Sequence, residues 1–276
     1  MDLSIVIVSW NVKDKLRANL QALFKSNVSF SFEVFVVDNN SSDGSAAMVE
    51  QEFPNVKLIS NPDNLGFSKA NNQAIKLINS RFTLLLNPDM QVFPDTLSNI
   101  LIWAENNPQA TVSGCRLVDE NNNIIKQVRR FPRFWDQLLI TLKVPHIFKN
   151  SVDNYLIKNF DYSREAKVDS IRGAFFLINN EAYQKLDSSK PFLDERYFIW
   201  FEEVDFCRRV YELGGEVWYS PAASCLDYVG ASFKQIKRRQ GQNYFSDSML
   251  KYFEKWGKKW ECQALKAAWF IVKLVV

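Results

Sequence analysis

Three groups of polar residues follow strongly apolar segments and could bind a charged or hydrogen-bonding ligand. They are Ser9-Trp10-Asn11 after residues 3–8, Asp38–Ser45 after residues 32–37, and Asn87-Pro88-Asp89 after residues 82–86. Carboxylates in such positions accept hydrogen bonds or bind hard cations such as Mg²⁺. The group with Asp38 and Asn40 is also typical of a turn before a helix cap, and Asp89 could cap a helix near Pro94. The residues alone leave these alternatives open.

A second candidate site begins with the acids Glu202, Glu203 and Asp205 and continues with Arg208 and Arg209. A carboxylate can take the proton of a reacting hydroxyl group, which is general-base chemistry. At helical spacing Glu202 and Asp205 share a face while Glu203 points elsewhere, so the three acids need not share a role. Acids also favour the first turn of a helix, and this structural explanation stays open.

Several other chemistries are excluded by what the sequence lacks. There is no Gly-x-Gly-x-x-Gly or Gly-Lys-Ser/Thr loop after the first apolar run, which argues against a dinucleotide fold and a P-loop. Four cysteines stand far apart without a Cys-x-x-Cys pair, and the single histidine, His146, reads as ordinary loop structure. Structural zinc and a disulfide scaffold are therefore excluded. With 47% hydrophobic and 24% charged residues the chain is globular.

The elements that must position these residues alternate between strand and helix. Apolar runs at 3–8, 32–37, 56–59 and 82–86 predict strands, and their continuous hydrophobicity predicts a parallel sheet buried on both faces. Helices are expected between them, one capped by Asn11, one by Ser42 or Asp43, and one over Phe67–Ile78. Beyond residue 109 the pattern predicts strands at 111–118, 124–128 and 171–178, and helices at 134–142 and 199–213.

The basic charge of the chain lies in its last segment. Residues 233–276 carry ten Lys/Arg and three acids, a net charge of +7, whereas residues 1–232 carry −4. Met249, Tyr252, Phe253, Trp256 and Trp260 recur at helical intervals among lysines, which predicts an amphipathic helix on a membrane surface. Packing of this tail on the rest of the chain or on a second subunit is the alternative. No nucleic-acid motif accompanies the basic charge.

Six ordered segments resemble family 2 glycosyltransferases, most closely the rhamnosyltransferase-type branch. They are residues 4–11, 36–45, 64–72, 84–89, 173–177 and 200–209, and the match runs from Leu3 to about Ser232. The resemblance implies an α/β GT-A fold, with a Rossmann-like, mostly parallel central sheet flanked by helices. It implies a nucleotide-sugar-binding half at 1–108 and an acceptor and catalytic half at 109–232. The basic amphipathic tail at 233–276, predicted from its charge and spacing, follows the match.

The resemblance also assigns donor-binding roles. Asp38 would accept a hydrogen bond from the base, and Asp89 would hold Mg²⁺ or Mn²⁺ against the diphosphate. The other donor-side residues are Ser9, Trp10, Asn11, Asn40, Asn64, Gly66, Asn71, Asn87 and Arg209. Arg209 could instead pair with Glu202 or Asp205. The histidine that the family usually adds to the metal site is missing here, and Asp227 is the nearest acid, with Tyr228 beside it.

On the acceptor side the resemblance makes Glu203 the general base, although the family has the shorter Asp there. Gly173, Ala174, Glu202 and Arg130 would line the acceptor, and a solvated basic loop is the alternative for Arg130. The implied activity is inverting transfer of a sugar, with dTDP-rhamnose favoured and a UDP-sugar as the alternative donor. The acceptor would be a glycan or a polyprenyl-diphosphate-linked glycan used for cell-surface polysaccharide.

The implied enzyme would be cytoplasmic and peripheral on the inner face of the cytoplasmic membrane, since no secretory signal precedes the first strand. A degenerate family member that binds sugar nucleotide or partner enzymes without turnover is the alternative, because the histidine is missing and Glu203 replaces an aspartate.

Overall fold

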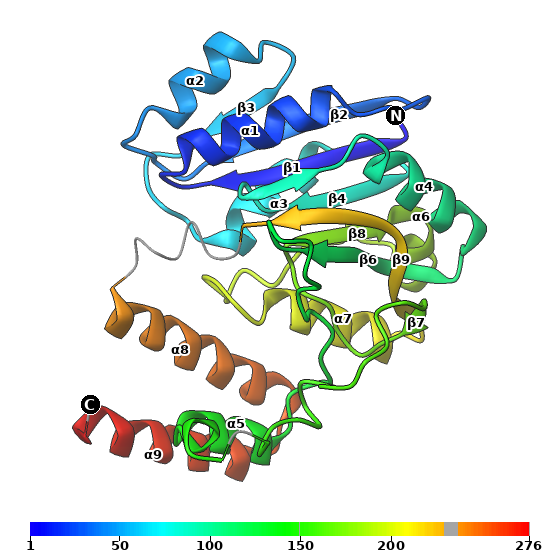
Figure 1. The fold of residues 1–276 in the computed structure, drawn as a ribbon. Helices are drawn as coiled ribbons and strands as arrows, with labels where there is room; N and C mark the ends of the chain where they lie inside the picture. Colours follow the sequence, from blue (N-terminus) through cyan, green and yellow to red (C-terminus); the bar gives the residue numbers. More distant parts are fainter. Residues whose placement is uncertain (149, 229–236, 276) are drawn as a thin grey trace.

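A computed structural model describes residues 1–148, 150–228 and 237–275 of the chain. They form one mixed sheet with helices against both faces (Figure 1). The strands are β1 Leu3–Ser9, β2 Phe32–Asp38, β3 Lys57–Ser60, β4 Phe82–Leu86, β5 Met90–Val92, β6 Ala110–Val118, β7 Ala166–Lys167, β8 Phe175–Asn179 and β9 Glu216–Asp227. The helices are α1 Lys13–Phe24, α2 Ser45–Glu52, α3 Phe67–Leu77, α4 Thr96–Asn106, α5 Phe134–Thr141, the 3₁₀ turn η1 Val144–His146, α6 Asn180–Leu186, α7 Glu202–Glu212, α8 Arg238–Trp256 and α9 Lys259–Val275.

The first half of the chain builds a parallel sheet in the order β3-β2-β1-β4. Ser9 lies opposite Asp38, and Asp38 lies opposite Ser60, so three strands end at one edge. The predicted strands, the helices between them and the α/β class are confirmed. The predicted Asn11 cap is wrong: α1 begins after Val12, and Asn11 Oδ1 accepts a hydrogen bond from the Ser42 N–H at 2.7 Å.

The second half extends the sheet with antiparallel pairs. Strand β8 runs antiparallel between β4 and β6, β9 is parallel to β6, and β5 closes the edge antiparallel to β9. The predicted strand over 124–128 is wrong, because Ile124 makes only an isolated bridge and the N–H groups of Gln127 and Val128 donate to Tyr162 Oη. The strand predicted from residue 171 begins at Phe175. The long strand β9 was not predicted.

Two hydrophobic cores lie on the two faces of the sheet. Helices α1, α2 and α4 cover one face through side chains such as Leu16, Met48 and Ile100. Helices α3, α6 and α7 cover the other, where the core also takes in side chains from α5, α8 and α9. The C-terminal helices are therefore part of the same packed body as the sheet (Figure 1).

The tail predicted as one interfacial helix consists of α8 and α9. Met249, Tyr252 and Phe253 are buried in the core, so these three side chains pack on the rest of the chain as the alternative stated. Trp260 and Phe270 are exposed. None of the helices in the described ranges has the length and apolarity needed to cross a bilayer. The boundary expected at residue 232 lies outside the described residues.

Candidate functional site

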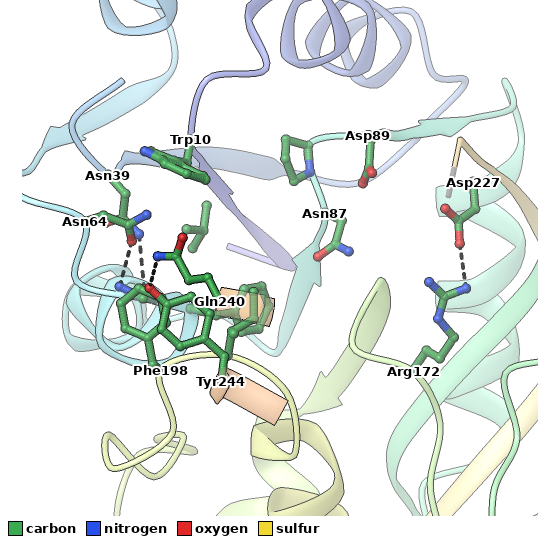
Figure 2. Close-up of a pocket in the computed structure, with 15 residues that line it drawn as sticks. Trp10, Asn39, Asn64, Asn87, Asp89, Arg172, Phe198, Asp227, Gln240 and Tyr244 are labelled. Carbon is green, nitrogen blue, oxygen red and sulfur yellow. Dashed lines mark hydrogen bonds and ion pairs between the residues drawn. The ribbon is translucent and has the colours of Figure 1, made fainter. Parts of the chain in front are cut away.

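A cavity of about 370 Å³ opens at the edge where β1 and β4 end (Figure 2). Its walls come from strand ends, from the loop before α3, from the segment before α7 and from the first turns of α8. The lining residues are Val8, Trp10, Asn39, Asn64, Gly66, Phe67, Asn87, Pro88, Asp89, Arg172, Phe198, Ile199, Asp227, Gln240 and Tyr244. Six of the predicted site residues are among them: Trp10, Asn64, Gly66, Asn87, Asp89 and Asp227.

One end of the cavity is built from aromatic rings and amides. The rings of Phe198 and Tyr244 stack with centroids 4.7 Å apart, and Trp10 lies across the cavity from them (Figure 2). Asn39 Nδ2 donates to the Gly66 carbonyl at 3.2 Å, and Asn64 Oδ1 accepts from the Gly66 N–H at 3.0 Å. Flat apolar faces beside amide groups can bind a planar heterocycle such as a nucleobase.

Gly66 is required by this end of the cavity. Its backbone has φ +81° and ψ 179°, a region that only glycine adopts readily. A Cβ atom there would lie 2.5 Å from the carbonyl oxygen of Phe198. The same carbonyl accepts the N–H of Phe67 at 2.7 Å, so the start of α3 is fastened to the segment before α7.

The other end of the cavity is acidic. Asp89 and Asp227 are 5% and 3% exposed, and they come together because β5 pairs with β9 with Met90 opposite Asp227. The Tyr228 N–H donates to the Asp89 carbonyl at 3.2 Å. Arg172 Nη1 lies 3.0 Å from Asp227 Oδ2, which provides a cation beside the two acids (Figure 2).

This acidic end fits a hard divalent cation. No group of three or more His, Cys, Asp or Glu residues surrounds one point in the described part of the chain. Two buried carboxylates, Asp89 and Asp227, nevertheless supply oxygen ligands of the kind that Mg²⁺ and Mn²⁺ prefer, and such ions often take their other oxygens from a phosphate and from water. Asp227 would have to exchange part of its contact with Arg172 for the metal.

Six predicted donor-side residues, Arg209 among them, do not line the cavity. Ser9 is fully buried, Asn11 bonds to the loop before α2, and Asn40 is exposed with φ +61°. Asp38 Oδ2 accepts from the Ser41 N–H at 2.9 Å, as the turn interpretation stated. Its Oδ1 is buried without a hydrogen-bond partner among the described residues, and the neighbouring Asn39 lines the cavity instead.

Asn71, the fifth of these residues, lies inside α3 and donates through Nδ2 to the Phe67 carbonyl at 2.9 Å. Its side chain is 1% exposed, so it supports the helix under the cavity rather than the cavity wall. Direct contact between Asn71 and a ligand stays a prediction.

The adjacent acids of α7 have different surroundings. Glu202 is 5% exposed, and burial together with the neighbouring Glu203 charge raises its pKa well above the ordinary glutamate value. Glu203 is half-buried, and burial raises its pKa while the positive charges of Arg129 and Arg172 oppose the rise. Neither Glu202 Oε2 nor Glu203 Oε2 has a hydrogen-bond partner in the described ranges.

Glu203 approaches the cavity through its neighbours. A Cβ added to Gly173 would lie 3.4 Å from Glu203 Cβ, so the predicted glycine allows this helix to pack closely. The next residue, Ala174, accepts the Asn87 N–H at 2.9 Å through its carbonyl. Arg172, which lines the cavity, precedes both, and its positive charge limits the rise in the pKa of Glu203. The predicted base Glu203 is not among the lining residues of the cavity, and its contact with Gly173 and the charge of Arg172 are what connect it to that site.

The other predicted arginines do not reach the cavity. Arg209 Nη2 donates to the Phe192 carbonyl, and its guanidinium lies 4.8 Å from the Phe206 ring centroid. No ion pair joins it to Glu202 or Asp205 in the parts of the chain that the structure describes, so that alternative is wrong. Arg130 is exposed, as expected of a solvated loop, and its N–H donates to the Tyr155 carbonyl.

Asp205 has a structural role instead. Its carboxylate accepts from Lys255 Nζ at 2.8 Å and from Trp256 Nε1 at 2.7 Å, and it also accepts from the Tyr197 hydroxyl group. It therefore connects α7 to the end of α8.

Four polar lining residues are missing from the predicted site: Asn39, Arg172, Gln240 and Tyr244. Asn39 and Arg172 adjoin motif residues, so their position in the sequence could have suggested them. Gln240 and Tyr244 lie on a helix far along the chain, and no sequence signal connects them to the strand ends.

Comparison with known sequences gives one family. The family described as Glycosyl transferase family 2 matches residues 4–183. An N-acetylglucosaminyl-diphospho-decaprenol L-rhamnosyltransferase of Mycobacterium tuberculosis is 25% identical over 210 residues, which cover 72% of this chain and 67% of that protein. The rhamnosyltransferase WbbL of Escherichia coli K12 is 23% identical over 233 residues, 82% of this chain and 83% of the relative.

Comparison with solved structures agrees on the fold. The mannosyltransferase PcManGT from Pyrobaculum calidifontis, in complex with GDP-Man and Mn²⁺, has a TM-score of 0.58 at 16% identity, covering 92% of this chain and 63% of that one. GalNAc-T7 with UDP, GalNAc and Mn²⁺ has a TM-score of 0.60 at 14% identity, covering 91% and 48%. At such identities these likenesses support the GT-A fold alone.

Proposed function

Because the chain belongs to glycosyl transferase family 2, we propose that it transfers rhamnose from a nucleotide-diphosphate donor to a polyprenyl-diphosphate-linked glycan. Membership of the family supports glycosyl transfer, and we assign in addition the sugar, the donor and the acceptor. The mycobacterial and E. coli relatives support rhamnose, and the name of the mycobacterial relative supports the lipid-linked acceptor. We favour dTDP-rhamnose as donor over a UDP-sugar.

The observation that carries the proposal is the polarity of the cavity. A nucleotide-diphosphate sugar has a planar base at one end and a diphosphate beside the reacting carbon. The cavity has stacked aromatic rings and amides at one end, and two buried carboxylates with an arginine at the other. We place the base between Trp10 and the Phe198–Tyr244 pair, and the diphosphate beside Asp89 and Arg172.

In the proposed reaction the acceptor hydroxyl oxygen attacks the anomeric carbon of the sugar while the bond from that carbon to the diphosphate oxygen breaks. Glu203 takes the hydroxyl proton, and the nucleoside diphosphate leaves with the bonding electron pair. A divalent cation bound by Asp89 and Asp227 would neutralise charge on the leaving diphosphate. Arg172 holds Asp227 in place and adds a second positive charge near the same oxygens.

The proposed acceptor places the enzyme at a membrane. An isoprenoid lipid stays in the bilayer, so a protein without a spanning helix among its described residues must reach it from the surface. We propose peripheral attachment at the cytoplasmic face, through surfaces that the core does not use. Exposed Trp260 and Phe270 on α9 support this position.

Transfer to a defined acceptor tests the proposal. The protein is incubated with Mn²⁺, dTDP-rhamnose and a water-soluble prenyl diphosphate that carries N-acetylglucosamine, and the product is identified by mass spectrometry. UDP-glucose and UDP-N-acetylglucosamine serve as alternative donors. Addition of one deoxyhexose is expected with dTDP-rhamnose only, and addition from a UDP-sugar instead would overturn the donor assignment.

Asp89→Asn is the matched variant. Because the carboxylate lies at the cavity wall, the variant should fold normally and lose Mn²⁺-dependent binding of nucleoside diphosphate. Unchanged affinity in Mn²⁺ titrations would exclude Asp89 as a metal ligand. If the unmodified protein binds nucleotide but neither transfers nor hydrolyses any donor, the non-catalytic alternative holds.

A further inference from the structure

A second, basic groove lies on the face of α8 that points away from the donor cavity. Two adjoining cavities of about 290 and 330 Å³ share Arg238, Gln242 and Trp269. Their walls come from α5 and η1, from α8 and α9, and from Trp200 before α7. On α8 the groove is lined by residues such as Arg238 and Gln242, whereas Gln240 and Tyr244 line the donor cavity from the opposite face.

The polar lining of the groove is cationic. Lys143, Arg238, Arg239 and Lys273 line it, and no Asp or Glu is among the lining residues that the structure describes. None of these four cations forms an ion pair with another described residue, and Lys273 Nζ lies 5.5 Å from the Trp269 ring centroid. The groove therefore presents positive charge that the described protein does not neutralise.

Helix stability does not explain the two arginines. Arg238 and Arg239 occupy the first turn of α8, where no acidic residue is present. This turn is the positive end of the helix dipole, and cations there are unfavourable. Both side chains are exposed, so they are not needed for packing either. A bound anion would use both the arginines and the N–H groups of the helix start.

The remaining walls are apolar and aromatic. Ile140, Trp200, Phe245 and Val272 line the groove, together with the ring of Trp269. The Trp269 Nε1–H is buried and has no hydrogen-bond partner among the described residues. This N–H group is therefore available to donate a hydrogen bond to a ligand beside the cations. Ile147 and Phe148, next to η1, are 78% and 67% exposed and continue the apolar surface outward.

We propose that this groove binds the diphosphate and first isoprenoid units of a lipid-linked acceptor. The cations and the indole N–H would hold the diphosphate, and the aromatic wall would hold the start of the lipid chain, which leaves over Ile147 and Phe148 toward the membrane. An inorganic anion would leave the apolar walls without a contact. A neutral lipid would leave the cations without a negative partner. This inference rests on the proposed lipid-linked acceptor.

The groove adjoins the aromatic end of the donor cavity. It is separated from the donor cavity by α8, whose diameter with side chains is about 10–12 Å. The backbone from Phe198 to Phe201 also connects the two sites, because Phe198 and Ile199 line the cavity and Trp200 lines the groove. Trp200 and Phe201 both have positive φ, 66° and 68°, and this bend turns successive side chains toward different sites.

Calorimetry with farnesyl diphosphate tests the groove. The full chain is first saturated with Mn²⁺ and the nucleoside diphosphate that stabilises it most, so that the donor cavity is filled. Farnesyl diphosphate should still bind. The double variant R238Q/R239Q should weaken this binding by about tenfold or more, because each arginine provides a charge-assisted hydrogen bond. Trp269→Phe keeps the aromatic wall but removes the N–H group, and it should weaken binding less.

Lys185→Gln is the control, since it removes one exposed cation from α6, away from the groove. Unchanged affinity of R238Q/R239Q and Lys273→Gln, with normal thermal unfolding, would overturn the proposal. Loss of farnesyl diphosphate binding in Asp89→Asn would show that the probe occupies the donor cavity. If inorganic pyrophosphate binds with the same affinity as farnesyl diphosphate, the groove binds an anion only and does not recognise the lipid.

Vesicles of phosphatidylglycerol provide the last comparison. If R238Q/R239Q abolishes vesicle binding and leaves farnesyl diphosphate binding intact, the groove recognises a membrane lipid and the acceptor assignment is wrong. A different result tests the proposed function. If the protein binds no nucleoside diphosphate in the presence of Mn²⁺, the proposed function is wrong, whatever the groove binds.

Discussion

Glu203 is the side chain on which turnover is proposed to depend, and its surroundings are suited to a base. It lies against Gly173, its pKa is raised by burial, and Arg129 and Arg172 keep the rise limited. A base must lose its proton before it can accept another, so these opposing effects decide the pH at which the enzyme begins to work.

Glu203→Gln keeps the size of the side chain but cannot accept a proton. We expect turnover to fall by about 10²-fold or more while donor affinity stays nearly constant. In the unmodified enzyme the acidic limb of the rate profile should lie above pH 4.5, the ordinary glutamate pKa, because burial raises that of Glu203. Steady-state kinetics over pH measure both, and wild-type turnover in the variant would exclude Glu203.

Glu202 should affect stability instead. Its raised folded-state pKa means that the folded protein holds this proton more tightly than the unfolded chain does. That stability is present below the ordinary value of 4.5 and is lost as pH rises through the raised pKa. Relative to the unmodified protein, Glu202→Gln should therefore gain unfolding free energy as pH rises.

Urea denaturation between pH 5 and pH 8 measures this difference, and exposed Glu120→Gln is the control. Parallel stability curves for Glu202→Gln and the unmodified protein would mean that Glu202 is not held in its neutral form.

At the scale of elements, the loop before α3 and the segment before α7 must stay together to shape the donor cavity. Gly66→Ala places a methyl group 2.5 Å from the Phe198 carbonyl and also strains the backbone. We expect a loss of at least about 3 kcal/mol in unfolding free energy, together with weaker nucleotide binding. Gly214→Ala is the control, because its φ of +83° is similar but nothing lies within 4 Å. It should cost only about 1 kcal/mol.

Helix α8 depends on α7 through one buried carboxylate. Asp205→Ala leaves the Trp256 indole and the Tyr197 hydroxyl without this acceptor, and Lys255 keeps only Asp194. A loss of about 3 kcal/mol is expected in urea denaturation. Asp247→Ala breaks the exposed pair with Lys251 on the same helix and should change stability by less than about 0.5 kcal/mol. Equal effects would contradict the role of Asp205.

At the scale of the whole molecule, the sequence predicts the first half of the fold better than the second. Continuous apolar runs identify β1, β2 and β4 because parallel strands are buried on both faces. Strand β9 escapes this pattern since its exposure alternates irregularly along its length. Its pairing with β5 then decides that Asp227 faces the same cavity as Asp89, which spacing alone cannot show.

The candidate site follows the same division. Trp10, Asn87 and Asp89 end predicted strands, and the structure places them in the cavity. Asp38 also ends such a strand, but its carboxylate accepts a hydrogen bond from the Ser41 N–H in the following turn. Backbone geometry therefore decides that Asn39, and not Asp38, lines the cavity. Tyr244 could not be predicted because α8 returns to the sheet only through packing of distant segments.

The shared wall between the two cavities has a thermodynamic consequence. If occupation of the groove stiffens α8, linkage requires that lipid and nucleotide change each other's affinity by the same factor, typically about 5–150-fold. The Kd of the nucleoside diphosphate, measured with and without saturating farnesyl diphosphate, should therefore shift as much as the reverse titration. Such reciprocity would let the enzyme hold its activated sugar firmly only where an acceptor is present, and so limit wasteful hydrolysis of the donor in bulk solution.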